Sequence, residues 1–219
     1  MNAVIIIPAH NEERKISEVI EGIRAVGLWA IVVVDDGSAD KTATVAAQAG
    51  ALVLRHRINR GQGAALRTGI DFALARGFTS AVFFDADGQM EPSEINLLLD
   101  KLNDGHDVVF GSRNLGRASN MPLSRKIVKG LALIFTRLTT GLEITDTHMG
   151  FQAWRMETLR CVNLDQDRMA HASQILSEIA RLKLKYTEAP VTIKYTDYSL
   201  RKGQNNLGLF GILWDLLIK

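Results

Sequence analysis

Two apolar, strand-like runs in this chain each end in a pair of carboxylates. Residues 31–34 run into Asp35 and Asp36, and residues 81–84 run into Asp85 and Asp87. In an open parallel sheet the ligand crevice lies outside the carboxyl ends of the strands, so we expect both acidic pairs to open onto one site. Such carboxylates suit a divalent cation that in turn holds phosphate oxygens. The pattern therefore predicts metal, diphosphate and transfer chemistry.

The second acidic pair gives the stronger metal signal. Asp85, Asp87 and Gln89 alternate along an extended segment, so all three side chains can offer oxygen atoms to one cation. The alternative is an acidic turn that caps the helix opened by Pro92. A cap would explain one acid, whereas the segment supplies two acids and a glutamine.

The first acidic pair is expected to divide its roles. Asp36, at the end of the strand, should face the ligand, while Asp40 or Ser38 should cap the following helix. Residues 8–12 bring further polar groups to the same rim of the crevice. His10, taken alone, reads more readily as a structural histidine than as a catalyst.

Two further segments carry weaker signals. Residues 59–66 form a glycine-rich loop that opens a helix, and such a loop either presents N–H groups to an anion or simply caps the helix. Asp146, in a loop of the second half, is a candidate general base or a hydrogen-bond partner of a sugar hydroxyl, with helix capping as the alternative.

The elements that must position these residues alternate between short β-branched runs and helical patterns, which predicts a mostly parallel, Rossmann-like α/β sheet flanked by helices. We expect strands at about residues 3–8, 30–35, 51–55, 80–85 and 107–111. A helix over residues 12–26, with Asn11 as its N-cap, would bury one aliphatic face. The second half should be helical, with a hairpin or strand pair near residues 185–196.

We interpret residues 1–219 as a single domain, in which residues 1–112 bind a nucleotide-like ligand and residues 113–219 shape the site of the other substrate. The composition, with 47% hydrophobic and 23% charged residues, is that of an ordinary globular protein. A net charge of +2 gives no global nucleic-acid signal. The single cysteine, Cys161, excludes an internal disulfide and fits a reducing compartment, and no secretory signal or spanning segment is apparent, so we expect a cytoplasmic protein.

Two amphipathic segments point to a membrane surface. Residues 121–140 combine Arg125, Lys126, Lys129 and Arg137 with aliphatic side chains, and residues 207–218 carry Asp215 as their only charge. Both segments could equally be helices that face the core. If the acceptor is lipid-linked, we expect it to approach here, at the inner face of the membrane. A membrane-protein partner or a homo-oligomer is compatible with the same segments.

In order along the chain, five motifs resemble family 2 of the inverting glycosyltransferases, and within it the dolichol- or polyprenyl-phosphate mannosyl- and glucosyltransferases. They are residues 8–12 (PAHNE), 34–42 (VDDGSADKT), 59–64 (NRGQGA), 85–89 (DADGQ) and 111–113 (GSR). The resemblance is strong over about residues 3–155. It implies a GT-A fold, a UDP- or GDP-sugar donor, Mg²⁺ or Mn²⁺, and one in-line displacement at the anomeric carbon.

The resemblance also implies roles for individual residues. The nucleoside would be held by Pro8, Ala9, Asn11, Glu12 and Asp36, and Gly63 would lie near the donor. Ribose, metal and diphosphate would gather at Asp85, Asp87 and Gln89, with Asp87 also counted as catalytic. Arg113 and Arg117 would contact phosphates of the donor or the acceptor.

Two departures from the family pattern leave the acceptor open. Met149 stands where the phosphoprenol enzymes have a serine before Gly150-Phe151, and residues 201–205 only echo their late basic lid. A phosphate acceptor is already ionised and needs no strong base. A sugar hydroxyl, as in cell-surface polysaccharide synthesis, would make Asp146 the leading base.

Two other classes of protein share part of this pattern. A haloacid-dehalogenase-type phosphatase is disfavoured because Gln89 follows the DADG segment and three strands precede it. A non-catalytic nucleotide-sugar sensor would use the same binding residues. We therefore favour a metal-dependent transferase that moves a hexose to a lipid-linked acceptor, most simply polyprenyl phosphate.

Overall fold

The computed structural model describes residues 2–116, 133–134, 136–146, 150–164 and 171–194. Within these ranges the strands are β1 (Ala3–Ala9), β2 (Ala30–Asp35), β3 (Leu52–Arg55), β4 (Ser80–Phe83), β5 (Val108–Ser112), β6 (Gln152–Arg155) and β7 (Tyr186–Pro190). The helices are α1 (Ile16–Val26), α2 (Thr42–Gln48), α3 (Gln62–Ala75), α4 (Ile95–Asn103), α6 (Met156–Leu159) and α7 (His171–Leu182), and a 3-10 turn, η1, spans Pro92–Glu94.

The strands form one sheet in the order β3-β2-β1-β4-β6-β5-β7. Strand β6 runs antiparallel to both of its neighbours, β4 and β5, while the other pairs of neighbours are parallel. The expectation of a mostly parallel α/β sheet flanked by helices is therefore confirmed, and all five strands predicted in the first half are present.

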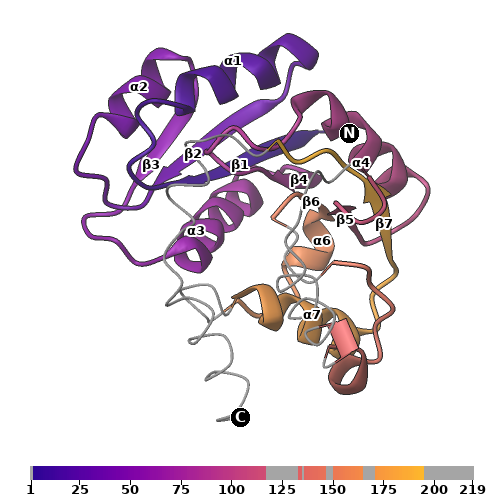
Figure 1. Cartoon of the computed structure of the whole chain (residues 1–219). Coiled ribbons are helices and arrows are strands. Elements are labelled where there is room, and N and C mark those ends of the chain that lie inside the picture. The colour runs from indigo at the N-terminus through magenta and orange to yellow at the C-terminus, as the bar shows by residue number, and fades with distance from the viewer. Residues whose placement is uncertain (1, 117–132, 135, 147–149, 165–170, 195–219) are drawn as a thin grey trace.

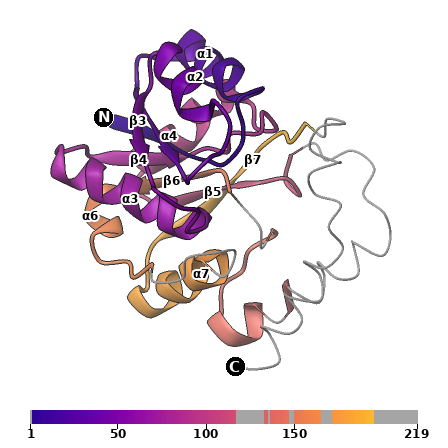
Figure 2. The same cartoon turned by 90° about the vertical axis from the view of Figure 1, so that its left-hand side faces the viewer.

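Helices cover both faces of the sheet (Figures 1 and 2). One core layer joins α1, α2 and α4 to the sheet side chains Ile5, Ile7, Val33 and Val82. The opposite layer joins α3, α6 and α7 to Ile6, Val34, Phe83 and Trp154. Because consecutive side chains of a strand point to opposite faces, β1 with its unbroken aliphatic run can serve both layers.

The predicted face of α1 is buried as expected, since Ile16, Val19, Ile20 and Ile23 are at most 4% exposed. On the other side of the sheet, a Cβ on Gly69 of α3 would stand 2.4 Å from Cγ2 of Ile6. Only a glycine allows the helix to approach β1 this closely. The contact fixes α3 so that its first turn, at Gln62, lies beside the carboxyl ends of the strands.

Two local predictions are wrong. Asn11 does not cap α1, which begins at Ile16: its backbone adopts a φ of 55°, and its Oδ1 accepts a hydrogen bond from the N–H of Ala39 instead (2.9 Å). Residues 186–190 form a single strand parallel to β5, not half of a hairpin, because the helix α7 before them provides a crossover connection. Beyond β7, Ile193 forms an isolated bridge with Met90.

Candidate active site

A cleft of about 420 Å³ opens at the carboxyl ends of the parallel strands. Its walls come from the ends of β1, β2 and β4 and from the loop that leads into α3. The lining residues are Pro8, Ala9, His10, Glu12, Asp36, Asn59, Gly61, Gln62, Ala65, Asp85, Ala86, Asp87 and Gln89. Seven of the predicted site residues thus lie on one cleft: Pro8, Ala9, Glu12, Asp36, Asp85, Asp87 and Gln89. Their individual roles stay predictions.

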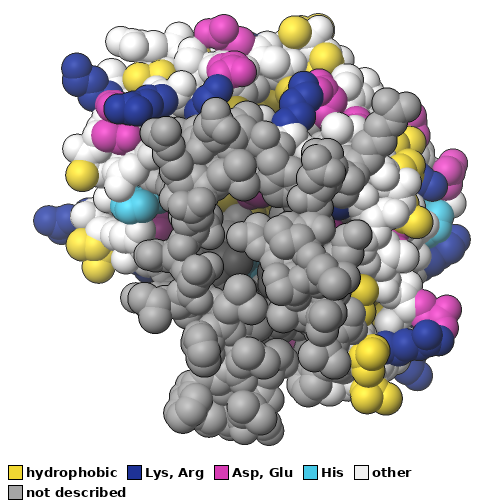
Figure 3. Space-filling model, in the orientation of Figure 1, with side chains coloured by type: hydrophobic (Ala, Val, Ile, Leu, Met, Phe, Trp, Pro, Cys, Tyr) yellow, Lys and Arg dark blue, Asp and Glu magenta, His cyan; other side chains and the backbone are white. Residues whose placement is uncertain are grey.

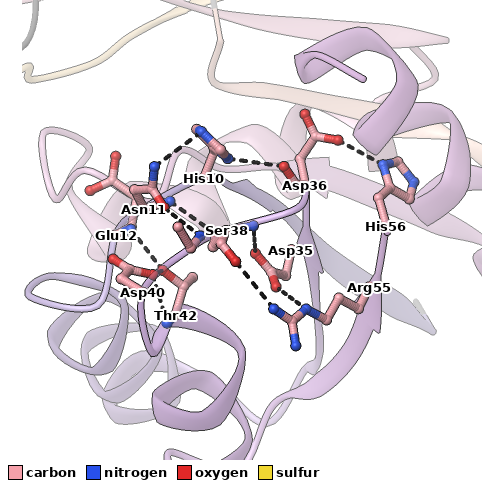
Figure 4. Close-up of polar contacts among 11 residues, drawn as sticks. His10, Asn11, Glu12, Asp35, Asp36, Ser38, Asp40, Thr42, Arg55 and His56 are labelled. Carbon is pink, nitrogen blue, oxygen red and sulfur yellow. Dashed lines mark hydrogen bonds and ion pairs between the residues drawn. The ribbon is translucent and has the colours of Figure 1, made fainter. Parts of the chain in front are cut away.

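The two carboxylates at the end of β2 face in different directions (Figure 4). Asp35 pairs with Arg55 across the β2–β3 ladder, where Nε lies 3.0 Å from Oδ2, and its Oδ1 accepts the N–H of Ser38. Asp36 lines the cleft and is 3% exposed. Asp35 closes a turn, and Asp36 is the side chain that reaches the cleft, where its contact with a ligand stays a prediction.

Three donors hold the carboxylate of Asp36. His56 lies with Nδ1 2.7 Å from Oδ1, the N–H of Arg60 donates to the same oxygen (2.9 Å), and the N–H of Gly61 donates to Oδ2 (2.7 Å). The glycine-rich loop therefore directs its N–H groups to a carboxylate of the protein itself. This arrangement fixes the loop against β2 and places Gly61 and Gln62 on the cleft wall.

Three other predicted residues have different surroundings. Gly63 is buried in the first turn of α3, and the wall of the cleft is formed by its neighbours Gly61 and Gln62. Asn11 joins the turn after β2, since its N–H donates to Ser38 Oγ (2.9 Å). Asp40 accepts the N–H of Thr42 at the start of α2 (2.9 Å), as expected of a residue that stabilises that helix end.

Asp85 has a strongly raised pKa. Burial raises its pKa to about 7, with Asp87 and Glu12 adding to the effect, while Arg113 and a hydrogen bond from Gln62 (3.2 Å) oppose it. Negative charge is thus concentrated at the point where β4 ends. Two carboxylates close to a cleft that admits phosphate oxygens suit Mg²⁺ or Mn²⁺, which typically bind one or two carboxylates together with substrate phosphates.

Protein ligands alone would not complete such a coordination sphere. In the ranges that the structure describes, His, Cys, Asp and Glu side chains nowhere form a group of three suited to a metal ion. Gln89 turns its backbone N–H to Asp87 Oδ1 (3.0 Å), which shapes the turn between them. The donor set therefore fits a cation that is held partly by Asp85 and Asp87 and partly by a bound diphosphate.

Arg113 and Asp146 form a paired unit beside the carboxylates. Nε of Arg113 lies 2.6 Å from Oδ2 of Asp146 and Nη2 lies 2.8 Å from Oδ1, and the Asp146 side chain is 1% exposed. Arg113 lines a second cavity of about 60 Å³, together with Asp85, Gln89, Met90, Gly111, Gly150, Phe151 and Ile193. The two cavities share Asp85 and Gln89.

Side chains from β5 and β7 hold the segment that carries Asp146. The carboxylate of Glu188 accepts the N–H of Thr145 (3.0 Å), Thr145 Oγ1 lies 2.6 Å from Ser112 Oγ, and Tyr186 Oη accepts the N–H of Glu143 (2.8 Å). The position of Asp146 is thus set by two neighbouring strands. An ion pair between residues 33 positions apart in the chain gives no pattern in the sequence.

Sequence reasoning did not single out three residues of this site. Gln62 donates to Asp85, His56 holds Asp36, and Gly150 lies so close to Asp85 that a Cβ there would stand 2.7 Å from Oδ2. The glycine of the Gly150-Phe151 pair was noted only as part of a motif. Several of the predicted residues lie outside the described ranges, so the predictions made for them stay untested: Arg117, Met149, residues 121–132 and residues 195–219.

The described part of the surface gives little indication of a binding partner. Basic and acidic side chains lie next to one another on the face shown in Figure 3, as expected for a net charge of +2. Among the described residues, no helix is both long and apolar enough to cross a membrane.

A helix-flanked α/β sheet with a carboxylate-rich cleft at the strand ends defines a glycosyltransferase of the GT-A fold. The chain belongs to glycosyl transferase family 2, whose family model matches residues 4–162. It is 32% identical over 98% of its length to the UDP-N-acetylglucosamine--dolichyl-phosphate N-acetylglucosaminyltransferase of Methanococcus voltae, of which 94% is covered. It is also 32% identical to the undecaprenyl-phosphate mannosyltransferase of Micrococcus luteus, with 96% of this chain and 90% of that protein covered.

Solved structures share the fold at lower identity. A crystal structure of glucosyl-3-phosphoglycerate synthase from Mycobacterium tuberculosis matches with a TM-score of 0.75 at 21% identity, covering 99% of this chain and 79% of that one. The same enzyme in complex with Mn²⁺ and UDP-glucose matches with a TM-score of 0.72 at 20% identity, covering 99% and 78%.

Proposed function

We propose that this chain transfers a hexose from a nucleoside diphosphate sugar to a polyprenyl phosphate, in a reaction that requires Mg²⁺ or Mn²⁺. The observation that carries the proposal is the meeting of the two cavities at Asp85 and Gln89. The larger cavity has room for the donor, and the smaller one brings Arg113 next to the same carboxylates. The transferred sugar would sit at this junction.

The donor side supports a diphosphate. A divalent cation bound at Asp85 and Asp87 would neutralise the departing diphosphate. Asp36, Glu12 and Pro8 line the same cleft and would hold the nucleoside. The relatives that act on dolichyl phosphate and undecaprenyl phosphate support a lipid acceptor, which would bring the protein to the cytoplasmic face of a membrane.

The chemistry at the junction needs no strong base. One ionised oxygen of the acceptor phosphate forms a new bond to the anomeric carbon, while the bond from that carbon to the donor diphosphate breaks and its electron pair stays on the diphosphate. No proton has to be removed. Arg113 would orient the acceptor phosphate, and Asp146 would hold the guanidinium by its two short hydrogen bonds.

Transfer of radiolabelled sugar from a panel of UDP- and GDP-sugars to undecaprenyl phosphate in detergent tests the proposal. Activity should appear with Mn²⁺ or Mg²⁺ and vanish with EDTA. Asp87→Asn should lower kcat at least about 100-fold because it removes a cation ligand. Asp71→Asn, which changes an exposed aspartate of α3, is the matched control. Full activity of Asp87→Asn, or transfer to a glycan hydroxyl and not to the lipid phosphate, would contradict the proposal.

A further inference from the structure

His56 is a largely buried histidine that holds the carboxylate of Asp36. It follows β3, its side chain is 9% exposed, and both ring nitrogens are engaged. Figure 4 shows the contact with Asp36. Nδ1 lies 2.7 Å from Asp36 Oδ1, and Nε2 lies 2.9 Å from Thr68 Oγ1 on α3. Because a carboxylate only accepts, Nδ1 carries the proton of the first bond.

The hydrogen-bonding capacity of Asp36 is nearly filled by these contacts. A carboxylate has about four lone-pair positions, two on each oxygen. His56 and the N–H of Arg60 both donate to Oδ1, and the N–H of Gly61 donates to Oδ2. One acceptor position therefore remains, on Oδ2, in a side chain that is 5% exposed and lines the cleft.

The number of open positions discriminates between nucleobases. The edge of uracil that faces a carboxylate presents one N–H between two carbonyl groups. The corresponding edge of guanine presents two adjacent donors, N1–H and the N2 amino group, which a carboxylate accepts with both oxygens. A carboxylate with a single open position accepts the one N–H donor of uracil but leaves one of the two guanine donors unpaired, which is costly in a buried site.

We propose that His56 is a positioning residue that makes the site selective for uridine diphosphate sugars. By occupying Oδ1, it leaves Asp36 able to accept one donor and not two. The inference rests on the proposed donor site, and it names the donor that the proposed function left open between UDP- and GDP-sugars. A purely structural His56 would affect the binding of both nucleotides equally.

The experiment is calorimetric titration of the full chain with UDP and with GDP, in the presence of Mn²⁺ and without any acceptor. The wild-type protein should bind UDP at least about tenfold more tightly than GDP. His56→Leu should reduce the UDP:GDP affinity ratio to less than about threefold, because Oδ1 becomes free for the second guanine donor. His56→Asn keeps a donor at the same position along the side chain and should preserve most of the ratio.

Two further variants serve as controls for His56→Leu. His106→Leu removes another half-buried histidine, whose Nδ1 bonds to the carbonyl of Lys101, and should leave the ratio unchanged. Thr68→Val removes the partner of Nε2 but not the donor to Asp36. It should lower the ratio only partly, and it keeps the inference testable if His56→Leu does not fold.

Each outcome of the titrations supports or overturns one part of the inference. Equal or tighter binding of GDP by the wild-type protein would overturn the assignment of the base. An unchanged ratio in a folded His56→Leu protein would overturn the role of His56. If neither nucleotide binds, the donor site itself is wrong. If UDP is preferred and the ratio responds to His56 while no sugar reaches undecaprenyl phosphate, the proposed acceptor fails and the present inference stands.

Discussion

Gly150 lies directly against the carboxylate of Asp85. A Cβ at this glycine would stand 2.7 Å from Oδ2 of Asp85 and 3.2 Å from Cε of Met90, which is closer than side chains tolerate. Gly150, two residues before β6, thus limits where the carboxylate of Asp85 can point. The site depends on the absence of a side chain at this position.

Gly150→Ala should therefore displace Asp85 with little effect on the fold. We expect kcat to fall about 10- to 100-fold, since a shift near 1 Å at a reacting centre has effects of that size. Steady-state kinetics with saturating donor and Mn²⁺ will measure it. Gly22→Ala, where the new Cβ would meet Cγ of Pro92 at 3.2 Å, controls for adding a methyl group at another close but partly exposed contact. Equal kinetics for both variants would refute the steric argument.

The stability of the metal-free protein should fall as the pH rises toward 8. The pKa of Asp85 is raised from 3.8 to about 7, so the folded state holds this proton more tightly than the unfolded state does. The stabilisation is complete below pH 3.8 and is lost as the pH passes through about 7. The shift corresponds to at most about 4 kcal/mol, and because the carboxyl opens onto the cleft we expect a loss of about 1 to 2 kcal/mol.

Thermal melts in EDTA between pH 5.5 and 8 isolate this effect. Asp40 and Glu178 have lowered pKa values, caused by hydrogen bonds from Thr42 and Arg181, so their contributions change only in more acidic solutions. In Asp85→Asn the fall of the melting temperature with rising pH should disappear. Mn²⁺ should reverse it in the wild-type protein, since a cation competes with the proton. If Asp85→Asn keeps the pH dependence of the melting temperature seen in the wild-type protein, the effect belongs to another group.

Arg113 and Asp146 should act as one unit. Arg113→Ala and Asp146→Asn are each expected to lower kcat/KM about 100-fold, and the double variant should be no worse than either one. The pH profile of Asp146→Asn should keep the wild-type shape, because the carboxylate positions Arg113 and removes no proton. Glu178→Gln breaks a comparable pair with Arg181 (2.6 and 2.7 Å) away from the cleft and serves as the control. If only Asp146→Asn loses the acidic limb of the pH profile of kcat/KM, Asp146 would instead be identified as a general base.

The segment after β7 should tune the affinity for the metal. Both carboxylate oxygens of Glu94 accept the N–H of Thr192 (3.0 and 2.9 Å), and the N–H of Lys194 donates to the carbonyl of Gln89 (2.8 Å). Glu94→Ala should loosen the turn at residues 85–89 and raise the apparent Kd for Mn²⁺ about tenfold. Titration calorimetry with Mn²⁺ in the presence of UDP measures this Kd. Glu21→Ala, which changes an exposed residue of α1, is the control. Unchanged Mn²⁺ binding would show that the contact is structural only.

The sequence predicts this molecule well where local pattern determines structure. The aliphatic runs of β1 and β2 and the buried face of α1 follow directly from residue type and spacing. Strand β6 was missed because Gln152–Arg155 contains no β-branched residue and no alternation of polar with apolar side chains, so its place between β4 and β5 is set by tertiary packing.

The candidate site divides in the same way. Asp36, Asp85 and Asp87 follow strands, so their convergence on one cleft could be predicted from a parallel sheet. The partners that fix them could not. His56 meets Asp36 from the next strand, and Asn11 bonds to Ala39 where a helix cap was expected, because both choices depend on the turn that follows β2.

The antiparallel direction of β6 has a consequence for how this protein could diversify. Phe83 of β4 and Phe110 of β5 both pair with Gln152, so the chain leaves the sheet after Ser112 and returns to it at the same edge, where the cleft lies. The stretch between these two points can change in length or composition without altering any strand register. Under the proposed function, acceptor preference would change through this stretch, which carries Asp146, while the pairing of β4, β5 and β6 is kept.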